Sequence, residues 1–173
     1  MLRMRVVAGT AKGRKLVAPK GLDVRPTTDR AREAIGNRLL SMGVLQDARV
    51  VDLFAGTGAL GIEALSRGAA HATFVDNAAP SVQAIERNLE TLGFADRATV
   101  VRADATTFRP AGPVDIAFVD PPYTWDGWPA LLERLTAAVV VCEARHPVEA
   151  PDGWELARSD RYGTTVISLL RST

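Results

Sequence analysis

The sequence between residues 49 and 143 alternates between short apolar runs and longer amphipathic segments, and this alternation restricts the fold more than any other feature. Short apolar runs predict strands, and segments with apolar residues three and four apart predict helices. The predicted strands cover residues 50–54, 71–76, 98–102, 114–120 and 138–143, and the predicted helices cover 59–67, 80–92 and 129–137. Strands that alternate with helices of this length predict an α/β fold with a parallel, doubly wound sheet.

The C-terminal segment departs from this alternation. Two predicted strands, 154–159 and 164–170, are joined by residues 160–163, which leave no room for a helix. We therefore expect an antiparallel hairpin at the edge of the sheet. This ending differs from the ordinary dinucleotide-binding fold, which finishes on parallel strands.

The N-terminal segment, which comes before this alternation, has predicted elements of its own. Residues 4–8 and 14–18 are short apolar stretches on either side of a glycine-containing turn, which predicts a small β-hairpin. The run Pro26-Thr27-Thr28-Asp29 is typical of a helix start, with hydroxyl groups for the cap and an acid in the first turn. We expect this helix to run to about Met42 and to end at Gly43.

Charge separates the N-terminal segment from the rest of the chain. The 173 residues have a net charge of +1, but residues 1–40 carry +7 and the remainder carries −6. Because cationic side chains that neutralise phosphates supply most non-specific nucleic-acid affinity, this asymmetry favours an RNA-binding extension, although a solvated basic surface has the same composition. We expect a basic extension over residues 1–45 and a catalytic core over residues 46–173.

Composition indicates an ordinary globular protein that works in the cytoplasm. Hydrophobic residues make up 47% and charged residues 24%, which excludes wholesale disorder. No apolar segment follows the basic N-terminus as in a signal peptide, and the longest apolar run, 137–142, is too short to span a bilayer. The single cysteine, Cys142, cannot form an internal disulfide and is expected to be a small buried side chain.

A glycine-rich loop follows the first predicted strand of the core. Gly56, Gly58 and Gly61 form a G-x-G-x-x-G pattern between a strand and a helix, where glycine permits a tight turn and close approach of a ligand to the helix N-terminus. The pattern alone fits a nicotinamide cofactor equally well, with Asp76 at a suitable distance for a ribose diol.

Two acids favour S-adenosylmethionine over a dinucleotide. Asp52 stands at the mouth of the loop, where it would repel a pyrophosphate and attract the cationic ammonium and sulfonium groups of S-adenosylmethionine. Asp104 follows the third strand, where it could accept a hydrogen bond from an adenine amino group. Together with Asp76, these acids are expected to face one crevice at the carboxyl ends of the strands.

The tetrapeptide Asp120-Pro121-Pro122-Tyr123 is the most specific feature of the sequence. It ends the fourth predicted strand, which lies beside the first in a doubly wound sheet. The exocyclic amine of a base is a poor nucleophile, and Asp120 with the carbonyl of Pro121 can accept its two N–H bonds and direct its lone pair at a methyl group. The prolines make this loop rigid, and Tyr123 offers a flat face on which a base can stack.

This chemistry relies on positioning, so we expect no metal site and no nucleophilic residue. The sulfonium group supplies the driving force, and orientation of the two substrates contributes about 7–11 kcal/mol. A base within a duplex cannot reach such a pocket, so the target is expected in a loop or flipped out. Trp125 and Trp128 follow the motif, and either a place in the base pocket or simple packing is consistent with the sequence.

The chain resembles the RsmD-type methyltransferases, which modify the amino group of a guanine in bacterial small-subunit ribosomal RNA. The resemblance covers nearly the whole length and rests on residues 5–9 with 13–16, on residues 25–30 with Arg32, Glu33 and Asn37, on residues 52–67 and on residues 120–123. It implies a Rossmann-like class I methyltransferase fold of seven strands, S-adenosylmethionine as the cofactor, and a small ribosomal subunit particle or its assembly precursor as the substrate.

The resemblance also implies residue roles. The expected cofactor contacts are Thr28, Asp52, Phe54, Ala55, Gly56, Thr57, Gly58, Gly61, Asp76, Asn77, Asp104 and Ala105. Independently of the resemblance, the charge of the basic extension makes Arg14, Lys15, Arg25, Arg30 and Arg32 the candidates for phosphate contact. One position departs from the family, because Gly36 stands where a large apolar residue usually precedes Asn37, and glycine also weakens a helix interior.

Several alternatives remain open from the sequence. A nicotinamide-dependent oxidoreductase could use the same glycine loop, but no acid or base stands near a hydride site. A non-catalytic RNA-binding module is disfavoured by the intact Asp120. An amino-methyltransferase that acts on another RNA base or on DNA uses the same tetrapeptide, although the length leaves no target-recognition domain for DNA. We expect the protein to act as a monomer.

Overall fold

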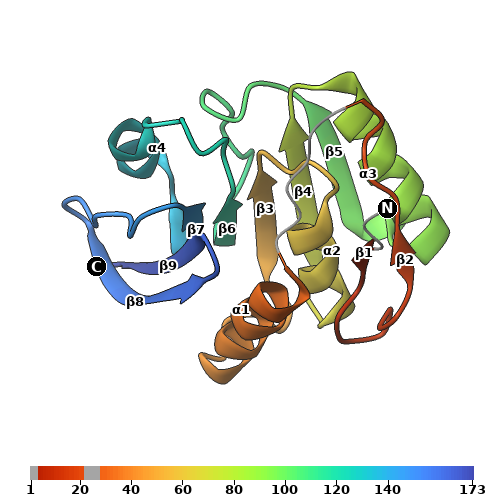
Figure 1. Cartoon of the computed structure of the whole chain (residues 1–173), viewed down its shortest axis with the longest axis horizontal. Helices are drawn as coiled ribbons and strands as arrows, with labels where there is room; N and C mark the ends of the chain where they lie inside the picture. The colour runs from red at the N-terminus through yellow and green to blue at the C-terminus, as the bar shows by residue number, and fades with distance from the viewer. Residues whose placement is uncertain (1–3, 22–27) are drawn as a thin grey trace.

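The order of the strands in the central sheet confirms the doubly wound topology. In the computed structural model, which describes residues 4–21 and 28–173, seven strands lie in the order β5-β4-β3-β6-β7-β9-β8 (Figure 1). Their bounds are β3 Arg49–Leu53, β4 His71–Asp76, β5 Ala98–Arg102, β6 Val114–Val119, β7 Ala137–Ala144, β8 Trp154–Tyr162 and β9 Thr165–Ser172. All pairs from β5 to β7 are parallel, and β9 is antiparallel to both β7 and β8. The chain therefore changes its direction of winding at β3.

The two faces of the sheet bury alternate residues of each strand against different partners. Val50, Phe74 and Phe118 belong to one core with α1 (Asp29–Ser41), α2 (Ala59–Ser66) and α3 (Ala79–Leu92). Residues of the opposite parity, such as Leu53 and Val119, pack with α4 (Trp128–Arg134) in a second core. A short 3-10 helix, Ala95–Arg97, follows α3. Burial on both faces explains why the parallel strands are almost continuously apolar.

The N-terminal hairpin packs into the first of these cores. Its strands are shorter than predicted, with β1 at Met4–Arg5 and β2 at Lys15–Leu16 (Figure 1). Met4, Val6 and Leu16 are buried together with residues of α1 and α2. The following helix, α1, begins where expected, because the hydroxyl of Thr28 accepts a hydrogen bond from the backbone N–H of Ala31 at 3.2 Å. Arg25, Pro26 and Thr27 lie outside the described residues.

A buried carboxylate connects this extension to the core. Both oxygens of Glu63 in α2 accept backbone hydrogen bonds from the hairpin, from Val7 at 3.0 Å and from Ala8 at 2.9 Å. The same carboxylate lies 3.6 Å from the guanidinium of Arg32 in α1 and 3.2 Å from that of Arg67. Charges of both signs are thus buried as a hydrogen-bonded cluster, as buried charges require. We call Glu63, Arg32 and Arg67 the Glu63 cluster.

Arg32 is therefore not an RNA contact, and this part of the sequence interpretation is wrong. Its side chain is 1% exposed, and it also donates to the carbonyl oxygen of Arg5 and to Asp29. The charge count of the N-terminal segment could not reveal this, because it does not distinguish a cation that faces solvent from one that pairs with an acid 31 positions later.

The cluster also explains Gly36. A Cβ atom at this position would lie 2.3 Å from the guanidinium carbon of Arg67, whose Nη1 donates to Asn37 at 3.0 Å. The missing side chain in α1 makes room for an arginine from the end of α2. The guanidinium group of Arg67 thus occupies the space next to the helix that a side chain at position 36 would need.

Two elements differ from their predicted bounds. The C-terminal hairpin turns at Gly163 and Thr164, while residues 160–162 remain paired in β8. Gly163 has a φ of +62°, which allows a two-residue turn and makes a longer loop unnecessary. Helix α4 ends at Arg134, three residues before the predicted end, because Leu135 is already extended and Ala137 begins β7.

Candidate active site

The carboxyl ends of four neighbouring strands bring the predicted site residues to one edge of the sheet. The glycine loop follows β3, and Asp76, Asp104 and Asp120 stand at or after the ends of β4, β5 and β6. Backbone hydrogen bonds hold these ends together, from Ala103 to Asp76 at 3.1 Å and from Ala55 to Val75 at 3.0 Å. Ligands of doubly wound sheets bind at this edge, next to the strand where the winding reverses.

The glycine loop takes backbone conformations that its sequence permits. Gly56 and Gly58 have φ angles of +59° and +78°, and Phe54 is held at +57°. The N–H of Gly56 donates to Asp76 at 2.9 Å, which fixes the loop against the end of β4. Gly58 precedes α2, and a Cβ there would lie 3.2 Å from Ile85 and 3.3 Å from Phe74. The loop thus exposes backbone, with no side chain, at the start of a helix.

Contrary to the expectation from the sequence, Asp52 does not face the crevice. It is 2% exposed, and its carboxylate accepts the N–H of Gly61 at 3.0 Å from beneath the loop. Burial raises the pKa of Asp52 to about 8, with smaller contributions from the charges of Asp76 and Glu143. The side chain therefore anchors the first turn of α2 and does not present a negative charge at the loop mouth.

This burial gives stability a pH dependence that can be measured. In the unfolded chain Asp52 ionises near 3.8, whereas in the folded protein its pKa is about 8. Between these values the folded state binds more protons than the unfolded state, so the contribution of Asp52 to stability falls as pH rises. Relative to an Asp52→Asn variant, the wild type is expected to lose stability steadily from about pH 4 to about pH 8 in urea unfolding experiments. A difference that stays constant over this window would contradict the buried, protonated carboxyl.

Gly61 is expected to be the least replaceable glycine of the loop. A Cβ at this position would lie 2.4 Å from the ring of Phe74, which is fully buried, so Gly61→Ala is expected to cost about 1–3 kcal/mol of unfolding free energy. Gly112→Ala is the matched control, since a Cβ there meets nothing within 4 Å. Urea denaturation of both variants tests this. Equal free energies of unfolding would show that the side chains next to Phe74 can shift to accommodate the added methyl group.

The remaining cofactor candidates lie around this loop. Asp76 is half-buried, and its second oxygen accepts the N–H of Ala78 at 3.0 Å across the exposed Asn77. Asp104 is exposed, and a hydrogen bond from the Thr106 hydroxyl lowers the pKa of its carboxyl, so the group stays ionised. Ala55, Thr57 and Ala105 are buried beneath the surface of the edge.

These groups fit S-adenosylmethionine. A half-buried carboxylate after β4 suits a ribose diol, and an ionised carboxylate after β5 suits an amino group on a purine ring. The backbone between Gly56 and Gly58 offers close approach to a ligand, and glycine at position 58 also lets the loop pack closely on Ile85 and Phe74 of the core. Thr28 is at the edge of the described region, where its hydroxyl caps α1.

The catalytic motif stands directly beside the glycine loop. Val119 pairs with Leu53, and the N–H of Asp120 lies 3.5 Å from the carbonyl oxygen of Leu53. Asp120 is half-buried, Pro121 is buried and Pro122 is exposed. The hydroxyl of Tyr123 and that of Thr165 are 2.7 Å apart, and the guanidinium of Arg145 lies 4.7 Å from the centre of the Tyr123 ring. The motif is therefore held between β3 and the start of β9.

A pocket of about 420 Å³ opens at this motif. Its walls include Pro121, Tyr123 and the loop from Glu143 to Pro151. Trp125 and Trp128 also line it, and their rings pack edge to face, 5.1 Å apart, with Phe54 5.4 Å from Trp125. The two tryptophans thus both pack and form part of the wall. We call this space the catalytic-loop pocket.

Sequence reasoning missed Glu143 and Arg145, which both line the catalytic-loop pocket. Glu143 is 4% exposed in β7, and Arg145 follows that strand. The rule that identified the other acids, a polar residue at the carboxyl end of a parallel strand, applies equally to Glu143. The fifth predicted strand carries no recognisable motif that would have singled Glu143 out.

The predicted phosphate contacts separate into different environments. Arg14 and Lys15 are exposed on the hairpin, where Arg14 also donates to the carbonyl oxygen of Thr91 at 3.0 Å. Arg30 is exposed on α1, Arg25 lies outside the described residues, and Arg32 is buried as described above. Three of the five candidates are thus placed where a phosphate could approach.

The described residues contain neither a cluster of metal ligands nor a membrane-spanning helix. Within residues 4–21 and 28–173, no three His, Cys, Asp or Glu side chains are grouped as a metal ion would require. In the same ranges, every helix is too short or too polar to cross a membrane. Cys142 is fully buried in β7, as expected, and burial raises the pKa of its thiol.

Comparison with known proteins agrees with this site. The family model described as "Conserved hypothetical protein 95" matches residues 4–171. A Bacillus subtilis protein named "Putative rRNA methyltransferase YlbH" is 38% identical over 97% of this chain and 98% of its own length. The "Ribosomal RNA small subunit methyltransferase D" of Escherichia coli is 45% identical over 70% of this chain and 61% of its own length.

A solved structure agrees with the fold as well. The Escherichia coli structure titled "Putative methyltransferase yhhF" superposes with a TM-score of 0.84 at 36% identity, and the match covers 99% of this chain and 98% of that one. The similarity includes the antiparallel hairpin at the sheet edge, which ordinary dinucleotide-binding folds lack, and decides against a nicotinamide-dependent oxidoreductase. The chain belongs to the RsmD-type family of methyltransferases.

Proposed function

We propose that this protein methylates the exocyclic N2 amino group of a guanine in the 16S ribosomal RNA of the small subunit. The observation that carries the proposal is the position of the Asp120–Tyr123 motif, one strand away from the glycine loop on the same edge of the sheet. The names of the relatives support ribosomal RNA as the substrate. The choice of guanine rests on the family resemblance.

The chain's own groups hold the amine in this mechanism. Asp120 and the carbonyl oxygen of Pro121 accept the two N–H bonds of the base, which turns the nitrogen lone pair toward the glycine loop. Tyr123 stacks on the base within the catalytic-loop pocket, where its hydroxyl contact with Thr165 fixes the ring. S-adenosylmethionine supplies an activated methyl group when bound, and after transfer the amine nitrogen releases one proton, which Asp120 is placed to accept.

The cofactor is held by residues of the other three strand ends. We assign the ribose hydroxyl groups to Asp76 and the adenine amino group to Asp104, with Asn77 and Ala105 beside them. Phe54, Ala55, Gly56, Thr57, Gly58 and Gly61 form the loop, Asp52 orders it from below, and Thr28 lies at the N-terminus of α1. Because one chain carries all these groups, a monomer is sufficient for the reaction.

The basic extension, residues 1–45, is assigned to RNA binding, and residues 46–173 are assigned to the cofactor and the chemistry. Neutralising Arg14, Lys15 and Arg30 together is expected to weaken RNA binding and to reduce the slope of log Kd against log salt by about 2–3. Fluorescence anisotropy with a 16S rRNA fragment at several salt concentrations measures this. An unchanged slope would show that RNA binds elsewhere.

Mass spectrometry of nucleosides tests the proposed function. Small subunits from cells that lack this activity are incubated with the protein and S-adenosylmethionine that carries a deuterated methyl group, and the rRNA is then digested. We expect one deuterated N2-methylguanosine per particle. A deuterated methyl group on an adenine or cytosine amine, or on DNA supplied in parallel, would assign the same site to a different base.

A further inference from the structure

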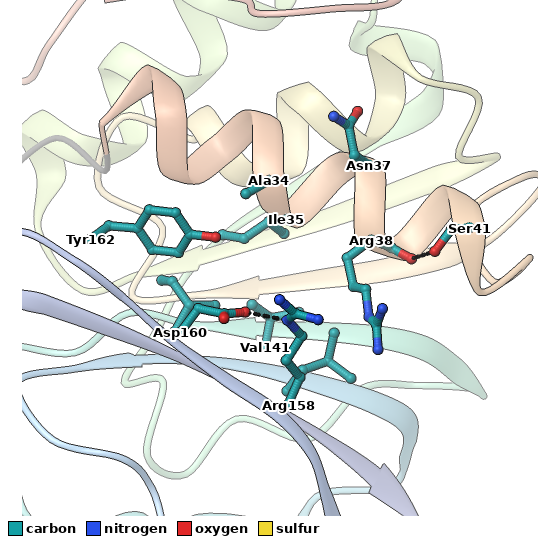
Figure 2. Close-up of a pocket in the computed structure, with 11 residues that line it drawn as sticks. Ala34, Ile35, Asn37, Arg38, Ser41, Val141, Arg158, Asp160 and Tyr162 are labelled. Carbon is teal, nitrogen blue, oxygen red and sulfur yellow. Dashed lines mark hydrogen bonds and ion pairs between the residues drawn. The ribbon is translucent and has the colours of Figure 1, made fainter.

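A second pocket lies between α1 and the C-terminal hairpin. It has a volume of about 320 Å³ and is lined on one side by Ile35 and Arg38 of α1 and on the other by Arg158, Tyr162 and Leu169 of β8 and β9 (Figure 2). We call it the hairpin groove. Nothing in the chemistry proposed above uses these side chains.

The walls of the hairpin groove combine an apolar floor with an aromatic end. Val141, Ile167 and Leu169 form the floor and are buried in the core. The ring of Tyr162 lies at one end of the groove next to α1 (Figure 2), and it is half-buried against the same core. A flat ring beside apolar surface is the kind of platform on which a nucleobase stacks.

Two arginines approach each other across the groove from different elements. Arg38 is exposed on α1 and its side chain points toward the strands, while Arg158 rises from β8 toward the helix (Figure 2). The Arg158 side chain is 53% exposed and pairs with Asp160 on the same strand. Two guanidinium groups on facing walls repel each other, and an anion between them relieves this repulsion.

Other charged residues lie on the helix and strands that form the groove. Arg30 lies two turns before Arg38 on the same face of α1, and Arg171 lies two residues beyond Leu169 on β9. The acids on these elements are Asp160, which already pairs with Arg158, Asp29, which pairs with Arg32, and Glu33 and Glu155, which are exposed. The side chains that line the groove itself include two arginines, Arg38 and Arg158, and one acid, Asp160, which is already paired with Arg158.

The groove is linked to the catalytic motif through the turn of the C-terminal hairpin. Tyr162 pairs with Thr165 across the turn of the hairpin, and the hydroxyl of Thr165 contacts that of Tyr123. From Tyr162 to Arg158 the strand extends about 13 Å away from this contact. A polynucleotide whose target base entered the catalytic-loop pocket could thus continue along the hairpin toward Arg158.

We propose that the hairpin groove binds single-stranded RNA next to the target nucleotide, with backbone phosphate on Arg38 and Arg158 and a base on Tyr162. This inference rests on the proposed function, because it takes the RNA strand from the same active site. It adds the C-terminal hairpin, and the side of α1 that faces it, to the RNA-binding surface of the basic extension.

The test removes each arginine separately and measures RNA binding apart from turnover. Arg38→Ala and Arg158→Ala are each expected to raise the Kd for a 16S rRNA transcript, measured by fluorescence anisotropy, by about tenfold and to lower the salt slope by about 1. The KM for RNA should rise in parallel, while kcat and the Kd for S-adenosylmethionine stay unchanged. Arg109→Ala is the matched control, because Arg109 is exposed beside the amino ends of the strands.

A variant of opposite sign makes the test sharper. Asp160→Asn removes the acid that pairs with Arg158 and is expected to tighten RNA binding by about threefold. If the wild type methylates RNA but all three groove variants bind it as the wild type does, the groove inference is overturned and the proposed function stands. If the wild type binds S-adenosylmethionine but methylates no RNA, the proposed function fails. In that case, unchanged RNA affinity in the three variants would also overturn the inference that the groove binds RNA.

Discussion

Replacing Asp120 by asparagine is expected to slow methyl transfer by about 10³-fold, as the loss of one preorganised partner for a reacting group does in other enzymes. Asp120 stands after β6, beside the glycine loop, and its backbone N–H approaches the carbonyl oxygen of Leu53. An amide can accept one N–H bond but cannot take up the proton that the methylated amine releases. Single-turnover transfer of a tritiated methyl group to small subunits measures the loss.

The control for this variant lies on the same loop. Asp126 is exposed and lines the catalytic-loop pocket, so Asp126→Asn changes the charge of the pocket without touching the motif. We expect it to transfer at nearly the wild-type rate. The Asp120 variant should have the wild-type Kd for S-adenosylmethionine, measured by calorimetry. It should also have the wild-type Kd for RNA, measured by fluorescence anisotropy. Normal turnover of Asp120→Asn would favour a non-catalytic role for the motif and would exclude the mechanism proposed here.

Glu63→Ala is expected to destabilise the protein by about 3–5 kcal/mol, because it removes the carboxylate that two buried guanidinium groups share, although Arg32 keeps its contact with Asp29. Arg32 and Arg67 have side chains that are 1% and 4% exposed, so water cannot replace the lost partner. The variant also loses the acceptors of two hairpin N–H groups, those of Val7 and Ala8. For a chain of this size, the loss corresponds to a fall in Tm of about 10 °C or more.

Calorimetric melting of Glu63→Ala and Glu86→Ala separates this effect from a general loss of charge. Glu86 is exposed on α3 and should melt within about 2 °C of the wild type. Hydrogen exchange adds a second measurement, since the amides of Val7 and Ala8 should lose protection first in Glu63→Ala. A melting temperature equal to that of the wild type would show that the hairpin and α1 do not depend on the Glu63 cluster.

The sequence predicts most of the fold because most of it depends on local patterns. The strand 71–76 and the strand 98–102 have the predicted bounds, and β6 lies beside β3 as the doubly wound topology requires. The C-terminal hairpin could be predicted because two strands with four residues between them permit little else. Its turn was placed wrongly, since strand pairing continued up to Gly163.

The site was predictable where a motif specifies it and unpredictable where packing decides. The glycine loop and Asp120–Tyr123 meet at one edge because both follow parallel strands. Arg32 looked like its basic neighbours in the sequence, yet Glu63 draws it into the core. Asp52 looked like an acid at a loop mouth, yet it turns beneath the loop to Gly61. Such outcomes depend on partners distant in the chain, which no local pattern describes.

The most direct test of this account is a crystal structure of the protein with S-adenosylmethionine. We expect the ligand along Gly56–Gly58, with its ribose on Asp76 and its methyl group directed at the carboxylate of Asp120 and the carbonyl oxygen of Pro121. A ligand bound with its methyl group away from these two acceptors, or bound at another edge of the sheet, would contradict the proposed transfer to a base amine.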